Sequence, residues 1–243
     1  MRGLNFHNVI DEIIKDTLAY VPKDKDLVIG ISGGLDSTIA AYIAVKGFGR
    51  DRVRGISLPC GIQSDMADVD LVFDALGIEK HEYNIEKVVE ANLALDDNYR
   101  KGNLTKGNMM ARTRMLQLYA QAGTYNGIVL GTTNRCEWEV GYFTKGGDGV
   151  EDVAMLMDLF KSEEYEIGRI LGIPKRILEK KPTAGLWIGQ TDEEELRITY
   201  DQIEACIRGL ETNQAVLDRY NYLHAISQHK RDGAHIAHIV SIK

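Results

Sequence analysis

The sequence contains little proline and little cysteine. Its 243 residues include four prolines, where average usage would give about 12. With 44% hydrophobic residues, this composition excludes a disordered or collagen-like chain. The three cysteines, Cys60, Cys136 and Cys206, are an odd number without CxxC spacing. Neither a disulfide framework nor a zinc site is therefore predicted, and we expect buried or incidental thiols in a reducing cytosol.

An excess of basic residues and a long apolar run are also missing. The net charge is −7, which argues against a protein that binds nucleic acid through a basic face. No apolar run approaches the roughly 20 residues that span a bilayer. Acidic residues interrupt the first apolar stretch, which is unlike a signal peptide. We expect a cytoplasmic protein with no nucleic-acid and no membrane partner.

Glycine, in contrast, is abundant. The chain has 24 glycines, against about 17 expected from average usage. Five of them fall between residues 131 and 149, namely Gly131, Gly141, Gly146, Gly147 and Gly149. Glycine permits turns and close approach of the backbone to a ligand, so this window is a candidate binding region.

Apolar runs and helical spacing alternate along the first half of the chain. Strands are expected at residues 26–31, 52–58, 80–84 and 127–131, and helices near 6–17, 38–44, 65–76, 86–95 and 108–121. No strand is expected after residue 131, where helices are expected at 162–171 and 191–229. Strand–helix–strand order favours parallel strands with right-handed crossovers. We predict one α/β domain over residues 1–243, a doubly wound, Rossmann-like parallel sheet with a helical C-terminal part.

The most specific local pattern is SGGLDS at residues 32–37, between a predicted strand and a predicted helix. A helix N-terminus at the carboxyl edge of a parallel sheet offers free N–H groups to a phosphate, and Gly33 and Gly34 allow the backbone to curl around it. Asp36 suits such a site if a divalent cation lies between carboxylate and phosphates. No lysine follows, which excludes the GxxxxGK[ST] loop. The alternative is a capped helix with a glycine turn.

The helix expected at 108–121 carries Met109, Arg112 and Leu116 on one face, with Arg114 pointing well away from that face. An arginine on an apolar face needs an anion or other acceptors, either a ligand or a structural ion pair. At the end of the last strand, Thr132 is a candidate donor to a nucleotide and Glu137 a candidate second ligand for Mg²⁺.

The glycine-rich segment 141–149 predicts a tight, exposed loop with a single lysine, Lys145. The aromatic rings of Tyr142 and Phe143 suit stacking on a ligand ring. We favour a ligand-binding loop over the alternative of a plain flexible turn.

These segments resemble known enzymes. The loop at 32–37 is similar to the SGGxDS loop of the N-type ATP pyrophosphatases, which have the adenine nucleotide alpha hydrolase-like fold. With GN-x-x-AR-x-R-M, GTxNxxE, GYFTKxGDG, DLFK (158–161), KPTAGLWxGQTDE (181–193) and HK (229–230), nearly the whole chain resembles the ammonia-dependent NAD synthetase family.

The resemblance implies a ligase that amidates deamido-NAD with ammonia through an acyl adenylate, releasing AMP and pyrophosphate. It implies a homodimer with Mg²⁺ as cofactor and ATP as co-substrate. Asp36, Glu137 and Lys161 would be catalytic, with Asp36 and Glu137 holding the metal. ATP would contact Gly30, Ile31, Ser32, Gly33, Gly34, Leu35, Asp36, Ser37, Thr132, Lys161 and Thr183, and deamido-NAD would contact Arg112, Lys145, Asp152, His229 and Lys230. Free ammonia is expected as the nitrogen source, because no glutaminase domain is expected in a chain of this length.

Two segments depart from the family pattern. Residues 153–160 lack a proline that the family usually has, which could loosen the segment carrying Lys161. Residues 232–238 also lack the usual prolines, which leaves open how the tail closes over the site. Two other functions remain open: adenylation of another small carboxylate, and a non-catalytic nucleotide-binding protein, against which the intact Asp36 and Glu137 argue.

Overall fold

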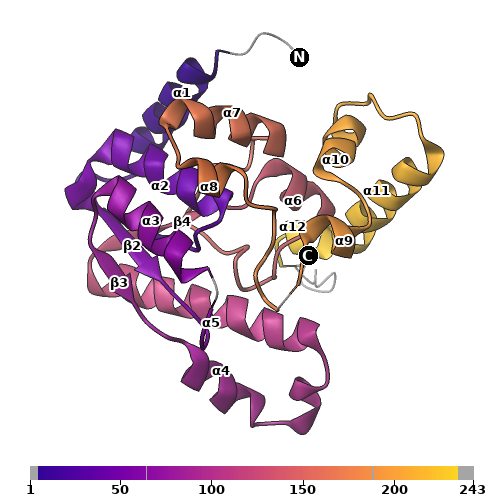
Figure 1. Ribbon diagram of the computed structural model, residues 1–243, viewed down its shortest axis with the longest axis horizontal. Helices are drawn as coiled ribbons and strands as arrows, with labels where there is room; N and C mark the ends of the chain where they lie inside the picture. The colour runs from indigo at the N-terminus through magenta and orange to yellow at the C-terminus, as the bar shows by residue number, and fades with distance from the viewer. Residues whose placement is uncertain (1–4, 64, 188, 235–243) are drawn as a thin grey trace, which may run out of the picture.

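The computed structural model describes residues 5–63, 65–187 and 189–234. Its centre is a parallel sheet with strand order β3-β2-β1-β4-β5 (Figure 1). The strands are β1 (Asp26–Gly30), β2 (Val53–Ser57), β3 (Lys80–Glu82), β4 (Gly127–Gly131) and β5 (Val153–Ala154). The order reverses direction between β1 and β4, and crevices at such points bind ligands in open α/β sheets.

Helices cover both faces of the sheet (Figure 1). One layer contains α1 (Phe6–Tyr20), α2 (Leu35–Phe48), α3 (Met66–Leu76), α7 (Lys161–Leu171) and α8 (Lys175–Leu178); the other contains α4 (Glu86–Leu93) and α5 (Asn103–Thr124). Leu27 and Ile29 of β1 pack against the first layer, and Val28 packs against the second. Because both faces are buried, this strand reads as a continuous apolar run and not as an alternating one.

A helical C-terminal part lies beside this sandwich, in orange and yellow in Figure 1. It contains α9 (Asp192–Leu196), α10 (Tyr200–Ile207), α11 (Gln214–Ile226) and α12 (Gln228–Arg231), and packs on α6 (Arg135–Val140). A separate apolar cluster, including Cys136, Ile203 and Leu223, joins these helices. Two 3₁₀ turns, Arg50–Arg52 and Asp97–Arg100, complete the elements.

The predicted α/β class, parallel sheet and helical C-terminal part are confirmed. One expectation about the second half is wrong. A fifth strand, β5, does follow residue 131, but it pairs with β4 over two residues only, which is too short for a periodic pattern. The helices expected at 191–229 are present as α9, α10, α11 and α12, with Arg197 and Gly209 in left-handed conformation at two of the breaks between them. The helix expected at 108–121 begins earlier, at Asn103.

The cysteines Cys60, Cys136 and Cys206 are free, as expected. Across the described ranges, no helix combines the length and the hydropathy needed to cross a membrane.

Candidate active site

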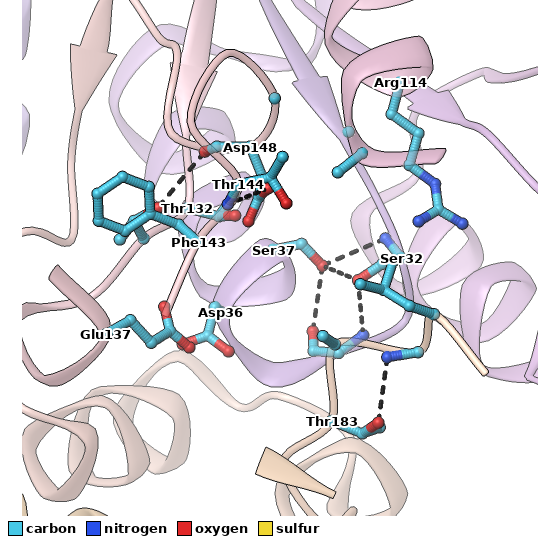
Figure 2. A pocket seen from close by; sticks show the side chains of 18 of the residues that line it. Ser32, Asp36, Ser37, Arg114, Thr132, Glu137, Phe143, Thr144, Asp148 and Thr183 are labelled. Carbon is cyan, nitrogen blue, oxygen red and sulfur yellow. Dashed lines mark hydrogen bonds between the residues drawn. The ribbon is translucent and has the colours of Figure 1, made fainter. Parts of the chain in front are cut away.

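A cavity of about 370 Å³ lies beyond the carboxyl ends of β1, β2 and β4. This volume is in the range of small-molecule sites. Twelve of the residues predicted to be catalytic or to contact ATP, the metal or deamido-NAD line it: Gly30, Ile31, Ser32, Gly34, Leu35, Asp36, Ser37, Thr132, Glu137, Lys161, Thr183 and Lys230. Figure 2 shows several of them pointing into one space from different elements.

The loop between β1 and α2 forms one wall of the cavity. Gly33 has a φ of +72°, and Gly34 is the N-cap of α2. The two serines hold the loop closed, since the Ser32 and Ser37 hydroxyls are 3.0 Å apart and the Gly34 N–H donates to Ser32 Oγ at 3.3 Å (Figure 2). The free N–H groups at the start of α2 therefore face the cavity with the positive end of the helix dipole, as an anion site requires.

Asp36, in the first turn of α2, is bound by a buried lysine. Lys161 Nζ lies 2.6 Å from Asp36 Oδ1 and 3.2 Å from Glu164 Oε2, and the Lys161 and Glu164 side chains are 4% and 0% exposed. Burial, the largest influence, would raise the pKa of Asp36, but the Lys161 charge and the hydrogen bonds from neighbouring side chains together outweigh burial and lower this pKa to about 2. Burial acts to lower the pKa of Lys161, yet the charges of Asp36 and Glu164 hold it well above its usual value.

Glu137 is oriented by a local sequence pattern. In the N-x-x-E segment that opens α6, Asn134 Oδ1 accepts from the Glu137 N–H and Glu137 Oε2 accepts from the Asn134 N–H, both at 3.0 Å. This reciprocal capping box fixes the Glu137 carboxylate beside Asp36 (Figure 2). Asn134 Nδ2 also donates to Asp36 Oδ1 at 3.0 Å, so one asparagine positions both carboxylates.

The two carboxylates suit a divalent cation. Burial and the neighbouring charge of Asp36 raise the pKa of Glu137 to about 8, although the charge of Lys161 acts in the opposite direction. Carboxylate oxygens are the ligands that Mg²⁺ prefers, usually together with substrate phosphates. Glu164 Oε1, fully buried, has no hydrogen-bond partner within the described part of the chain. The donor set therefore fits Mg²⁺ between Asp36 and Glu137.

Thr183 lines the cavity from the segment between α8 and α9. Its hydroxyl donates to the Gln190 carbonyl at 2.8 Å and accepts from the Gly185 N–H at 3.1 Å (Figure 2). The Gln190 side chain in turn accepts from the Leu186 N–H at 2.8 Å. This segment is thus held by its own hydrogen bonds at the mouth of the cavity.

The glycine-rich loop 141–149 is less exposed than the sequence suggests. Phe143 is 7% exposed and stacks on Trp138, with ring centroids 5.2 Å apart. The prediction of an exposed loop is therefore wrong at Phe143. Phe143 and the half-buried Tyr142 do, however, line the cavity. Lys230 holds the loop, because its ammonium group donates to the Gly141 and Phe143 carbonyls, each at 2.7 Å.

Four residues predicted to contact deamido-NAD lie outside this cavity: Arg112, Lys145, Asp152 and His229. All four are exposed. Arg112 donates to the Lys145 carbonyl at 3.3 Å, and the Lys145 ammonium group donates to the His229 carbonyl. Asp152 accepts from Tyr119 at 3.2 Å and from the Val129 N–H at 2.8 Å.

Arg112 does not lie on a buried face of α5, contrary to the helical-wheel prediction, because the buried face is formed by Met110, Ala111 and Thr113. Arg114 is the half-buried arginine of this helix, and it lines the cavity near Ser32 (Figure 2). Its Nε donates to the Leu58 carbonyl at 3.2 Å. The spacing of apolar residues along the sequence does not identify the buried face of α5, because that face depends on the elements against which α5 packs.

Sequence reasoning also missed residues from the C-terminal helices. Tyr200, at the start of α10, donates its hydroxyl toward Glu137 Oε1 at 3.1 Å and Asp192 Oδ2 at 2.9 Å. The Tyr200 ring lies below the Lys161 ammonium group, 5.3 Å from its centroid. No motif marks Tyr200, whereas Asp192 lies within the KPTAGLWxGQTDE segment. The N-x-x-E capping box of Asn134, by contrast, was readable in the sequence.

The departure at residues 153–160 does not loosen Lys161. Met155, Leu156, Leu159 and Phe160 are buried, and Lys161 itself is 3% exposed. Apolar packing takes over the role that a proline would have in restricting this segment. The altered tail, 232–238, lies outside the described residues beyond residue 234.

Comparison with known proteins agrees with this geometry. The family model described as NAD synthase matches residues 6–235. The NH(3)-dependent NAD(+) synthetase of Thermococcus sibiricus is 44% identical, over 84% of this chain and 81% of its own; that of Thermococcus kodakarensis is 45% identical, over 82% and 79%. The solved structure of NMN synthetase from Francisella tularensis has 40% identity and a TM-score of 0.87, covering 96% of this chain and 97% of its own. The chain therefore belongs to the NAD synthase family.

Proposed function

We propose that the cavity described above is where this chain carries out the family reaction, with the residue roles that follow. The chain is a ligase that amidates deamido-NAD with ammonia and uses ATP. The observation that carries the residue roles is the meeting of the phosphate loop, Asp36, Glu137 and Lys161 in one cavity.

The loop at residues 30–37 binds the ATP phosphates through the N–H groups at the start of α2 and the hydroxyls of Ser32 and Ser37. Thr132 and Thr183 contact the nucleotide from β4 and from the segment between α8 and α9. This arrangement holds the α-phosphate within reach of a substrate carboxylate, so that a large part of the catalysis is positioning.

Asp36 and Glu137 are the residues that would hold Mg²⁺, which would supply positive charge beside the phosphates of ATP. Lys161 is bound by Asp36 in the structure and contributes a fixed positive charge next to the phosphate loop. Asn134 and Tyr200 keep the two carboxylates in place through the hydrogen bonds already described.

The nicotinate carboxylate attacks the α-phosphate, which forms an acyl adenylate and releases pyrophosphate. Ammonia then attacks the activated carbonyl carbon, the bond to AMP breaks, and the amide forms with loss of a proton. No side-chain nucleophile is required; fixed donors and charges stabilise the transition states. Free ammonia is the nitrogen source, and the cytoplasm is the proposed location.

A second copy of the chain completes the dinucleotide site. Arg112, Lys145, Asp152 and His229 are exposed and lie outside the cavity of a single chain. One helical turn after Arg112 on α5, Leu116 is 56% exposed. Large exposed apolar side chains beside polar ones are typical of protein–protein contacts. We therefore propose a homodimer in which the outer face of α5 is part of the interface.

The test mixes the protein with Mg·ATP, ammonium and deamido-NAD, and measures NAD and pyrophosphate. Both products should appear in equal amounts, and Asp36→Asn should abolish both in protein that circular dichroism shows to be folded. If folded wild-type protein forms neither product, the proposal is wrong. Pyrophosphate release with another small carboxylate, and not with deamido-NAD, would support the alternative of a different adenylated acid.

The similarity to the Francisella tularensis NMN synthetase favours one such acid, nicotinate mononucleotide, as a second acceptor. Its nicotinate group is the same, and it lacks the adenylate part that the exposed residues outside the cavity would contact. The ratio of kcat/KM for the two acceptors decides the preference. An Arg112→Met substitution should lower kcat/KM for deamido-NAD more than for the mononucleotide.

A further inference from the structure

A cluster of ion pairs lies against the phosphate loop, and two of its members, Asp65 and Lys180, line the cavity. It contains Asp65 and Asp68 at the start of α3, Arg176 of α8, and Lys180, which follows α8. Lys180 Nζ lies 3.0 Å from Asp68 Oδ2 and 3.4 Å from Asp65 Oδ2, and Arg176 pairs with the other oxygen of Asp68. None of these residues belongs to the motifs discussed above. We call this cluster the brace.

The brace touches the phosphate loop itself. Lys180 Nζ donates to the Gly33 carbonyl at 3.4 Å. A Cβ placed on Gly33 would lie 2.9 Å from Asp68 Cβ and 3.0 Å from the Val69 backbone nitrogen, so the loop and the first turn of α3 are in van der Waals contact. Because the C=O and the following N–H of a trans peptide point in opposite directions, holding the Gly33 carbonyl also fixes the direction of the Gly34 N–H.

The brace also controls charge next to a site for anions. Asp68 is 6% exposed, and Asp65 lines the same cavity as the phosphate loop. Burial would raise the pKa of Asp68, but the hydrogen bonds from Lys180 and Arg176 outweigh burial and lower it, so the carboxylate is ionised. Two bare carboxylates at this position would repel bound phosphates, and Lys180 is placed between both carboxylates and the loop.

We propose that Lys180 is a positioning residue of the nucleotide site, which fixes the Gly33–Gly34 peptide and neutralises Asp65 and Asp68 against the phosphate loop. Lys180 is three residues before Thr183, and therefore also ties the segment between α8 and α9 to the loop. The inference rests on the proposed binding of ATP phosphates by this loop. It assigns Lys180 no contact with the reacting atoms.

The test compares Lys180→Met and Lys180→Arg with Lys175→Met, which removes the same charge from a side chain on α8 that is 83% exposed. Lys180→Met should raise KM for Mg·ATP and the inhibition constant of inorganic pyrophosphate roughly tenfold, with kcat and KM for ammonium changed less than about threefold. Lys180→Arg should restore KM to within about threefold, and Lys175→Met should match the wild type.

Asp65→Asn separates the electrostatic role from a merely structural one. The Asp65 side chain is 31% exposed and caps no N–H of α3, so this variant should fold even if Lys180→Met does not. It should lower KM for Mg·ATP, and combined with Lys180→Met it should return much of the lost affinity.

An unchanged KM for Mg·ATP in folded Lys180→Met overturns the inference, as does an Asp65→Asn variant with unchanged or raised KM. If the wild type itself binds Mg·ATP but forms no product, the proposed function fails and not this inference. Titration of each variant with Mg·ATP in a calorimeter gives affinity without turnover and keeps the two outcomes apart.

Discussion

Gly33 is the position where the phosphate loop depends most directly on the absence of a side chain. Its φ of +72° lies in the left-handed region, which costs a residue with a Cβ about 1–2 kcal/mol. In addition, the new Cβ of Gly33→Ala would meet Asp68 Cβ at 2.9 Å and the Val69 nitrogen at 3.0 Å. These are atoms of a packed helix that cannot move cheaply, and overpacking of this kind costs about 1–3 kcal/mol more.

Gly209 provides the matched control. Its φ is +69°, and nothing lies within 4 Å of a Cβ placed there. Gly209→Ala therefore carries the backbone cost alone, whereas Gly33→Ala carries the backbone cost and the clash. For a chain of this size each kcal/mol lowers the melting temperature by roughly 2–4 °C. We expect Gly33→Ala to melt several degrees below Gly209→Ala.

Thermal unfolding of both variants at one protein concentration, followed by circular dichroism, measures this difference. KM for Mg·ATP should rise in Gly33→Ala and remain unchanged in Gly209→Ala, because only the first variant displaces the loop from α3. Equal melting temperatures for the two variants would refute the close packing of the loop on α3. An unchanged KM in a destabilised Gly33→Ala would show that the loop tolerates displacement.

Three further changes test other parts of the site. Lys161→Met leaves Asp36 without its buried partner, so kcat/KM for ATP should fall by about 10²–10³-fold in the pyrophosphate assay; a fall of less than threefold would contradict the role of Lys161. Burial and neighbouring carboxylates raise the pKa of Glu151 to about 7. The ionised carboxylate therefore lowers the free energy of unfolding by an amount that grows as pH rises from about 4.5 to 7. Glu151→Gln should therefore raise the melting temperature at pH 8 but not at pH 4.5, unlike the exposed control Glu79→Gln, and equal shifts at both pH values would exclude this cause. Leu116→Glu on the outer face of α5 should convert the proposed dimer to a monomer in size-exclusion chromatography, and an unchanged dimer would place the interface elsewhere.

The wrong predictions have physical causes in common. The strand β5 is not predicted because two residues are too few to show an alternating or apolar pattern. Its pairing also depends on β4 lying next to it in the fold. The prediction for the buried face of α5 is wrong because the spacing of apolar residues does not identify the neighbour of a helix, and α5 packs on β1 and β4 through Met110 and Ala122. Because α5 packs on the sheet in this way, the Arg114 side chain lines the cavity.

Local chemistry was readable from the sequence alone. Apolar runs that end in glycine predicted β1 and β4, because buried parallel strands need no alternation. The SGGLDS pattern predicted a loop at a helix N-terminus, and the structure places its residues around a cavity at the sheet edge. The N-x-x-E pattern orients Glu137 through contacts within one turn of helix. Interactions between residues that are close in sequence leave their pattern in the sequence.

The abundance of glycine and the scarcity of proline take on meaning only through contacts made across the fold. Gly33 must lack a side chain because α3 lies against it, and Gly141 must lack one because a Cβ would meet Ser227 of the C-terminal helices. Lys161 lies 125 residues from Asp36, Tyr200 lies 63 from Glu137, and Lys180 lies 147 from Gly33. The sequence determined the local shape of the phosphate loop and of α6. Only the tertiary structure decided which distant charges surround them, because such pairings depend on how the chain folds back and not on any periodic pattern.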